Sequence, residues 1–123
     1  MSKRSAYILL TDMLEAVNAI QEYTVGLDYE SFLANRMARD AVIRNVQVLG
    51  EAANRISKPF RDQYSMIEWM RIIRTRHILV HDYFGLDYEI IWRIITVHIP
   101  PLREAVKQIL DSAPPEDADI EQI

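Results

Sequence analysis

Cysteine is absent from this 123-residue chain, which excludes a disulfide framework and a thiolate metal site. Glycine is scarce, with three residues, while half of the chain is apolar, and this balance favours helices over a turn-rich β fold. No apolar run is long enough to span a membrane, and no secretion signal is visible at the amino terminus. The length suits one domain. We therefore expect a cytoplasmic all-α protein without membrane contact.

An excess of basic residues is also missing, since the net charge is -4. Much of the negative charge lies at the carboxyl terminus, where residues 111–123 hold five acids and no base. The first 110 residues hold all 14 bases against the remaining 13 acids. A wide basic surface for processive, non-specific binding to nucleic acid is therefore excluded, and any nucleic-acid site should be focused.

Apolar residues recur at helical spacing in the first half of the chain. Residues 3–23 predict a first helix that ends before Gly26. Asp28 is a candidate N-cap for a second helical region, which extends over residues 29–57 and is broken near Asn35. The apolar positions are Ile8, Leu9, Met13, Ala16, Val17 and Ile20 in the first helix, and Val42, Val46, Leu49, Ala53 and Ile56 in the second.

The second half of the chain predicts shorter helices. Residues 59–66 are expected to form a loop, after which Ser65 caps a third helix and Glu68 completes a capping box. Asp87 caps a fourth helix, which the pair Pro100-Pro101 must end or kink because proline lacks an amide donor. The residues that follow, up to Leu110, continue as a short fifth helix or as the far side of the kink.

These elements predict a compact, dimerising bundle of four to five helices. The helical domain is expected to include residues 1–112. Residues 113–123 are acidic and begin with Ala113-Pro114-Pro115, a composition that favours a disordered tail.

The third helix contains the densest cluster of groups suited to catalysis. Three arginines and two histidines fall within residues 71–81, and no acid lies between Glu68 and Asp82. Guanidinium groups bind phosphate oxygens in a bidentate manner, and imidazole transfers protons near neutral pH. A site for a phosphate-bearing ligand is therefore predicted at Arg71, Arg74, Arg76, His77 and His81.

A rotation of about 100° per residue divides this cluster between two faces of the helix. Arg76 falls on the apolar face, where an unpaired charge is costly, and Glu51 is its candidate partner. Arg74, His77 and His81 fall on a different face. Because Arg76 and His81 are roughly 140° apart, either the helix unwinds near His81 or two copies of the chain pool these groups in a symmetric dimer.

Arg76, His81 and Tyr83 form the pattern Arg-x4-His-x-Tyr. Together with Leu49-Gly50-Glu51-Ala52-Ala53, residues 87–92 and Pro100-Pro101-Leu102, it resembles the HEPN superfamily and, within it, the HepT-like toxins. The resemblance covers most of residues 4–110. It implies a helical dimer with a cleft at its interface, which cleaves RNA without a metal ion and needs no cofactor.

The resemblance also implies roles for individual residues. Arg76 and His81 are the expected catalytic groups, and Arg74, His77 and Glu51 are the supporting ones. The expected antitoxin is an MntA-like nucleotidyltransferase, which transfers AMP onto Tyr83 and assembles with the dimer in a larger complex. His77 departs from the family pattern, in which a small polar residue, most often Asn, follows the motif Arg.

Other interpretations of the same residues stay open. His77 and His81 have the spacing of a helical zinc pair, but the glutamate of a zincin and cysteines are missing, so no metal site is predicted. A non-catalytic helical dimer that binds a nucleotide or docks a nucleotidyltransferase is the main alternative function. A structural dimer with a basic groove is the other.

Overall fold

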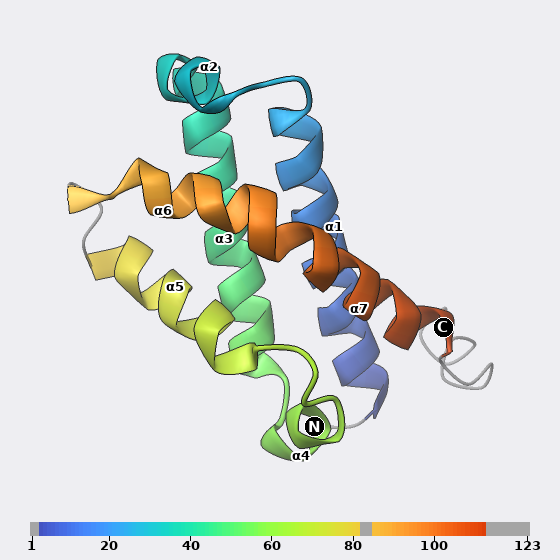
Figure 1. Cartoon of the computed structure of the whole chain (residues 1–123). Coiled ribbons are helices and arrows are strands. Elements are labelled where there is room, and N and C mark those ends of the chain that lie inside the picture. The colour runs from blue at the N-terminus through green and yellow to red at the C-terminus, as the bar shows by residue number, and fades with distance from the viewer. Residues whose placement is uncertain (1–2, 82–84, 113–123) are drawn as a thin grey trace.

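The computed structural model describes residues 3–81 and 85–112, with the side chains of residues 6–77 and 85–112. Every regular element in this part of the chain is helical, which confirms the predicted all-α class (Figure 1). The predicted tail at residues 113–123 and Tyr83 lie outside the described residues, as does the side chain of His81. None of the described helices is long and apolar enough to cross a membrane.

Four long helices form the body of the bundle. The first is α1 (Lys3–Thr24), which packs against α3 (Arg36–Arg55), and α3 in turn packs against α5 (Trp69–His81). The last is α7 (Ile99–Asp111), which packs on α1. In Figure 1 the continuous helical segment that ends with α7 crosses α3 and α1. The predicted helix over residues 3–23 is thus confirmed as α1.

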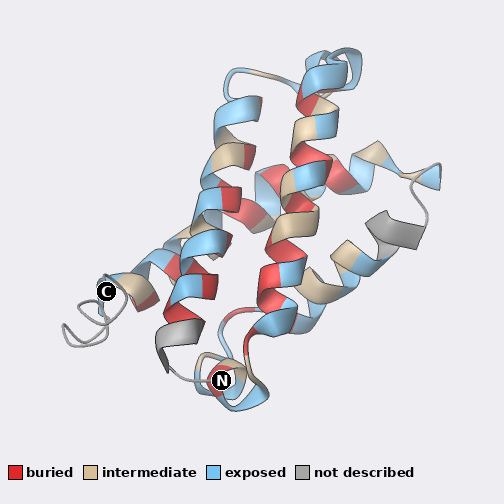
Figure 2. Ribbon diagram, turned by 180° about the vertical axis from the view of Figure 1, so that it is seen from behind, coloured by how far each residue is buried: buried red, intermediate tan, exposed pale blue. Residues whose placement is uncertain are grey.

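The hydrophobic core lies between these helices, and Figure 2 shows the buried residues on their inward faces. All five apolar positions of the predicted stripe from Val42 to Ile56 are buried, which confirms the second helical region. Ile8 was expected in the core and is 43% exposed instead, because it projects from the outer side of α1. The largest fully buried side chains include Leu10, Met13, Ile20, Phe32, Ile99 and Val106.

The turn between α1 and α3 follows the sequence prediction closely. Gly26 has a φ of 77°, a left-handed conformation that favours glycine. Asp28 caps α2 (Tyr29–Ala34) by accepting a 2.8 Å hydrogen bond from the Ser31 amide, and this bond lowers the pKa of the Asp28 carboxyl. Asn35 separates α2 from α3 and caps α3 through the Ala38 amide at 3.0 Å.

A helix replaces the loop that was predicted for residues 59–66. The six-residue α4 (Lys58–Gln63) has proline among its first two positions, where a missing amide donor has no helical partner to lose. Lys58 and Asp62 stabilise it further as an ion pair at 2.9 Å. Pro59 therefore lies in the first turn of a helix, whereas the sequence analysis placed it at the start of a loop.

The predicted fourth helix and its continuation to Leu110 form three successive helical elements. Asp87 caps α6 (Tyr88–Arg93) as predicted, with its carboxylate 2.9 Å from the Glu89 amide. A π-helical turn, η2 (Ile94–His98), follows, in which the Ile99 amide donates to the Ile94 carbonyl. Both prolines then lie in the first turn of α7, so the expected interruption occurs one turn earlier, within η2.

Candidate active site on α5

The start of α5 is fixed by Trp69 rather than by Ser65. Trp69 is buried, and its indole Nε1 donates a 3.0 Å hydrogen bond to the Tyr64 carbonyl. The Glu68 carbonyl accepts from the amide of Ile72 at 3.2 Å, the first turn of the helix. The predicted capping box is therefore wrong, because Ser65 lies in the preceding turn and Glu68 stands immediately before the helix.

Gly50 and Arg76 hold α3 and α5 close together. A Cβ atom built on Gly50 would stand 2.3 Å from the Arg76 Cβ and 3.1 Å from the Ile72 carbonyl oxygen. Only a glycine lets the two helices approach this closely. The Arg76 side chain, which is half-buried, therefore begins inside the helix contact, in agreement with its predicted place on the apolar face.

Glu51 does not form the expected ion pair with Arg76. The ion pairs among residues 3–81 and 85–112 do not join these two side chains, and Glu51 is exposed. The reason is that Gly50, one residue earlier, occupies the point of contact with α5, and a helical neighbour leaves the axis about 100° away. A supporting role for Glu51 therefore stays a hypothesis.

Arg74 and His77 are exposed, while Arg76 is half-buried, so the predicted division of the cluster between two faces is confirmed for these three residues. Met70, Arg74 and His77 follow one another at steps of four and three residues and form one stripe. His81 is the last residue of α5. The backbone of α5 is helical up to this residue, so the helix does not unwind before His81.

An apolar cavity of about 130 Å³ lies on one flank of the contact between α3 and α5. Val46, Leu49 and Ile72 line its base, and Thr75, Arg71 and His98 are among its polar lining. The Arg71 Nη1 atom is 3.4 Å from the His98 Nδ1 atom. Thr75 and His77 project roughly 100° to either side of Arg76, so the His77 stripe lies on the opposite flank from this cavity.

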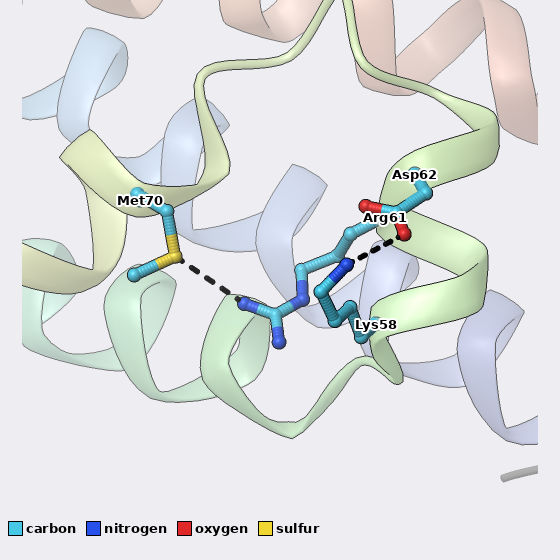
Figure 3. A network of polar contacts seen from close by, with 4 residues as sticks. All are labelled: Lys58, Arg61, Asp62 and Met70. Atoms are coloured by element: carbon cyan, nitrogen blue, oxygen red, sulfur yellow. Dashed lines mark hydrogen bonds and ion pairs between the residues drawn. The ribbon is translucent and has the colours of Figure 1, made fainter.

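Near the start of α5, α4 adds basic residues that the sequence prediction missed. An open groove of about 470 Å³ between the two helices is lined by Lys58, Arg61, Arg71 and Arg74 together with Asp62 and Glu68. Figure 3 shows Arg61 reaching from α4 toward Met70 of α5, with an Nη1 to Sδ distance of 3.7 Å. The signals for α4 were Pro59 and the four-residue spacing of Lys58 and Asp62.

The fold and the site together define a class of protein. It is an all-helical bundle in which arginines and histidines, concentrated on one helix, form a candidate phosphate-binding site. The family model described as Ribonuclease HepT-like matches residues 13–109. A putative RNase of Methanocaldococcus jannaschii is 38% identical over 87% of this chain and 98% of its own length. A probable ribonuclease HepT of Thermococcus cleftensis is 36% identical over 82% of this chain and 92% of its own length.

A putative RNase of Caldanaerobacter subterraneus subsp. tengcongensis is also similar, with 35% identity over 82% of this chain and 90% of its own length. No solved structure matches the chain significantly. The family match spans all the segments on which the resemblance to HepT-like proteins rests, from Leu49-Gly50-Glu51-Ala52-Ala53 to Pro100-Pro101-Leu102. This chain belongs to the HepT-like ribonuclease family.

Proposed function

We propose that this protein is a metal-independent endoribonuclease and the toxin of a toxin–antitoxin pair. The observation that carries the proposal is the place of Arg76, half-buried against Gly50 on a helix that continues to His81, in a chain of a ribonuclease family. Arginine at that position offers a fixed guanidinium for a phosphate, and the histidine five residues later offers a group that transfers protons near neutral pH.

The proposed reaction uses the ribose 2′-hydroxyl as the nucleophile. One His81 accepts the 2′-hydroxyl proton while the 2′ oxygen attacks the adjacent phosphorus. The bond from phosphorus to the 5′ oxygen breaks, and the second His81 or a water molecule protonates the leaving oxygen. Arg76, assisted by Arg74 or His77, stabilises the charge on the phosphoryl oxygens. The products are a 2′,3′-cyclic phosphate and a 5′-hydroxyl.

Two copies of the chain form the proposed active site. Within one ideal helix, Arg76 and His81 project roughly 140° apart, so a single α5 aims them at different places. A two-fold axis beside α5 would bring two Arg76 and two His81 side chains to one groove. The stripe of Met70, Arg74 and His77 is exposed beside the motif, so it would remain accessible to RNA at the groove that the two copies share.

An MntA-like nucleotidyltransferase is the proposed antitoxin, and Tyr83 is its proposed target. Tyr83 follows His81 by two residues. A phosphodiester-linked AMP on its phenol would bring negative charge and the shape of a nucleotide to the arginines of the site. A tether this short gives the adduct a high effective concentration, so it would compete with RNA even if its intrinsic affinity were low.

Cleavage of RNA by the purified wild-type protein and by His81→Ala tests the proposed activity. The wild type should cut RNA, and His81→Ala should lose about 10²- to 10⁴-fold in rate, the usual contribution of a positioned acid or base. Circular dichroism must show that the variant is folded. If the wild type binds a nucleotide but cuts no RNA, the non-catalytic dimer is the better description of the protein.

A further inference from the structure

The groove between α4 and α5 has more positive charge than its own acids neutralise. Its lining contains four basic side chains and two acidic ones. Asp62 is paired with Lys58 at 2.9 Å, and Glu68 is paired with Arg71 at 3.2 Å. Both acids are therefore engaged. The charges of Arg61 and Arg74 are left without an acidic partner in the described part of the chain.

Arg61 is held over the groove by a neutral contact. Its Nη1 atom lies 3.7 Å from the Met70 Sδ atom, a weak acceptor, as Figure 3 shows. Its Nε atom is buried and has no hydrogen-bond partner within the described residues. Because the sulfur is a weak and uncharged acceptor, a phosphate oxygen would be a stronger partner for the terminal guanidinium nitrogens of this side chain.

Arg74 connects the groove with the proposed active site along α5. Arg74 lines the groove, and it belongs to the same stripe as His77, which leads toward His81. Seven residues separate Arg74 from His81, a distance of about 10 Å along a helix. A stacked nucleic-acid strand rises about 3.4 Å per nucleotide, so the groove begins on the order of three nucleotides from the histidine.

We propose that this groove binds the phosphates of the RNA strand on one side of the scissile bond, with Arg61 as its principal contact. The inference rests on the proposed ribonuclease function and adds a second substrate subsite to it. Single-stranded RNA fits because the groove is open and its basic side chains outnumber its acidic ones. Binding there is therefore expected to depend on charge and chain length rather than on sequence.

Arg61→Gln and a matched control, Arg36→Gln, test the groove with two substrates. Arg36 is an exposed arginine at the start of α3, whereas α4 follows the other end of that helix (Figure 1). A 12-nucleotide RNA can reach the groove, and a dinucleotide cannot. With the long RNA, Arg61→Gln should raise KM by about tenfold, because a charged hydrogen bond to phosphate is lost, and should leave kcat almost unchanged.

With the dinucleotide, Arg61→Gln and Arg36→Gln should both match the wild type. Arg61→Lys keeps the charge and should restore most of the affinity for the long RNA. The slope of log affinity against log salt should fall by about one in Arg61→Gln and stay unchanged in Arg61→Lys. Thermal melts of all three variants must first show a folded protein. An unchanged KM for the long RNA in folded Arg61→Gln would overturn the groove as a subsite.

A binding measurement separates this inference from the proposed catalytic function. Fluorescence anisotropy with the 12-nucleotide RNA is recorded on His81→Ala, alone and combined with Arg61→Gln. Weaker binding in the combined variant supports the groove even if the wild type cuts no RNA, an outcome that would remove only the ribonuclease proposal. If His81→Ala and the combined variant bind the RNA equally, the groove is not an RNA site. A loss of affinity for an acidic surface of the antitoxin in the combined variant would then assign the groove to that partner.

Discussion

Gly50 of α3 lies directly against Arg76 of α5, so closely that a methyl group at residue 50 would stand 2.3 Å from the Arg76 Cβ. Both atoms are attached to helix backbones, so neither can rotate away. The two helices would have to separate to admit the methyl group. The same contact fixes where the guanidinium of Arg76 begins, so the packing of the bundle and the geometry of the candidate site depend on one residue.

Gly50→Ala should therefore destabilise the protein. Alanine is favoured over glycine in a helix by about 1 kcal/mol, but overpacking of this kind typically costs about 1–3 kcal/mol, and here the opposing atom cannot move alone. We expect a net loss in the free energy of unfolding, measured by urea denaturation. RNA cleavage should fall as well, since Arg76 is displaced.

Gly85→Ala is the matched control for this substitution. A Cβ at Gly85 meets nothing within 4 Å, and the backbone φ of this residue is not positive. Its stability should be unchanged or higher by about 0.4–1 kcal/mol, because alanine restricts the unfolded chain. A Gly50→Ala protein as stable as Gly85→Ala would show that α3 and α5 separate without cost.

Mixing two inactive variants should restore activity if the active site is shared between protomers. In a heterodimer of Arg76→Ala and His81→Ala, one protomer keeps His81 and the other keeps Arg76. A pooled site would then contain one intact pair, whereas a site within one protomer would contain none. We expect RNA cleavage to reappear after the two proteins are unfolded and refolded together.

Light scattering on each variant is the control for this experiment, because Arg76 lies in a helix contact and its loss can affect assembly. Both variants must be dimers before they are mixed. A wild-type protein that is monomeric at tens of micromolar would remove the shared site, as would a mixture of dimers that stays inactive.

The helices that the sequence predicted well are those whose signals are local. Asp28 and Asp87 each cap a helix as expected, because an N-cap depends only on a side chain and the amides two or three residues later. Asn35 lies at the predicted break and also caps α3. The second helical region was also predicted with its break. Local hydrogen bonding and apolar spacing were sufficient for these elements.

Sequence analysis missed features that depend on which of two structures a residue adopts, or on contacts between residues that are distant in the chain. Pro59 can end one helix or begin the next, and only the structure shows that it begins α4. The role of Gly50 was also invisible, because it depends on Arg76, 26 residues away, meeting the same point. The expected pair of Glu51 with Arg76 failed for the same reason, since Gly50 occupies the contact.

Phe32→Ala should cost about 3–5 kcal/mol in the free energy of unfolding. Phe32 is 0% exposed, and its ring connects α2 to α6, with centroid distances of 5.2 Å to Trp92 and 6.3 Å to Tyr88. Leu33→Ala, a change to its 37% exposed neighbour, should cost much less. Urea unfolding of both variants measures the difference, and equal losses would contradict the assigned core.

RNA cleavage should persist in the presence of EDTA. The proposed reaction uses His81 and the arginines for proton transfer and charge stabilisation, so a divalent ion has no assigned role. The products should carry 2′,3′-cyclic phosphate or 3′-phosphate ends, which phosphatase treatment and mass spectrometry distinguish. Activity that disappears with EDTA and returns with a divalent ion would replace this mechanism with a metal-dependent one.

Modification by the antitoxin should be found on Tyr83 and not on the other tyrosines. Among the described tyrosines, Tyr7 is buried, and Tyr29, Tyr64 and Tyr88 pack against aromatic rings. Tyr23 is 48% exposed and so provides an internal control for non-specific transfer. After incubation with the nucleotidyltransferase and ATP, the intact mass should rise by one or more AMP units, and peptide spectra should place them on Tyr83.

Tyr83→Phe should keep its RNA cleavage and become resistant to this neutralisation, because phenylalanine retains the ring but has no hydroxyl to accept the phosphate. Tyr23→Phe should be neutralised as fast as the wild type. An adduct on Tyr23 or Tyr88, or a Tyr83→Phe protein that the transferase still inactivates, would show that another residue or a non-covalent complex controls the activity. The ribonuclease activity itself does not depend on that outcome, since Arg76 and His81 are unchanged in both variants.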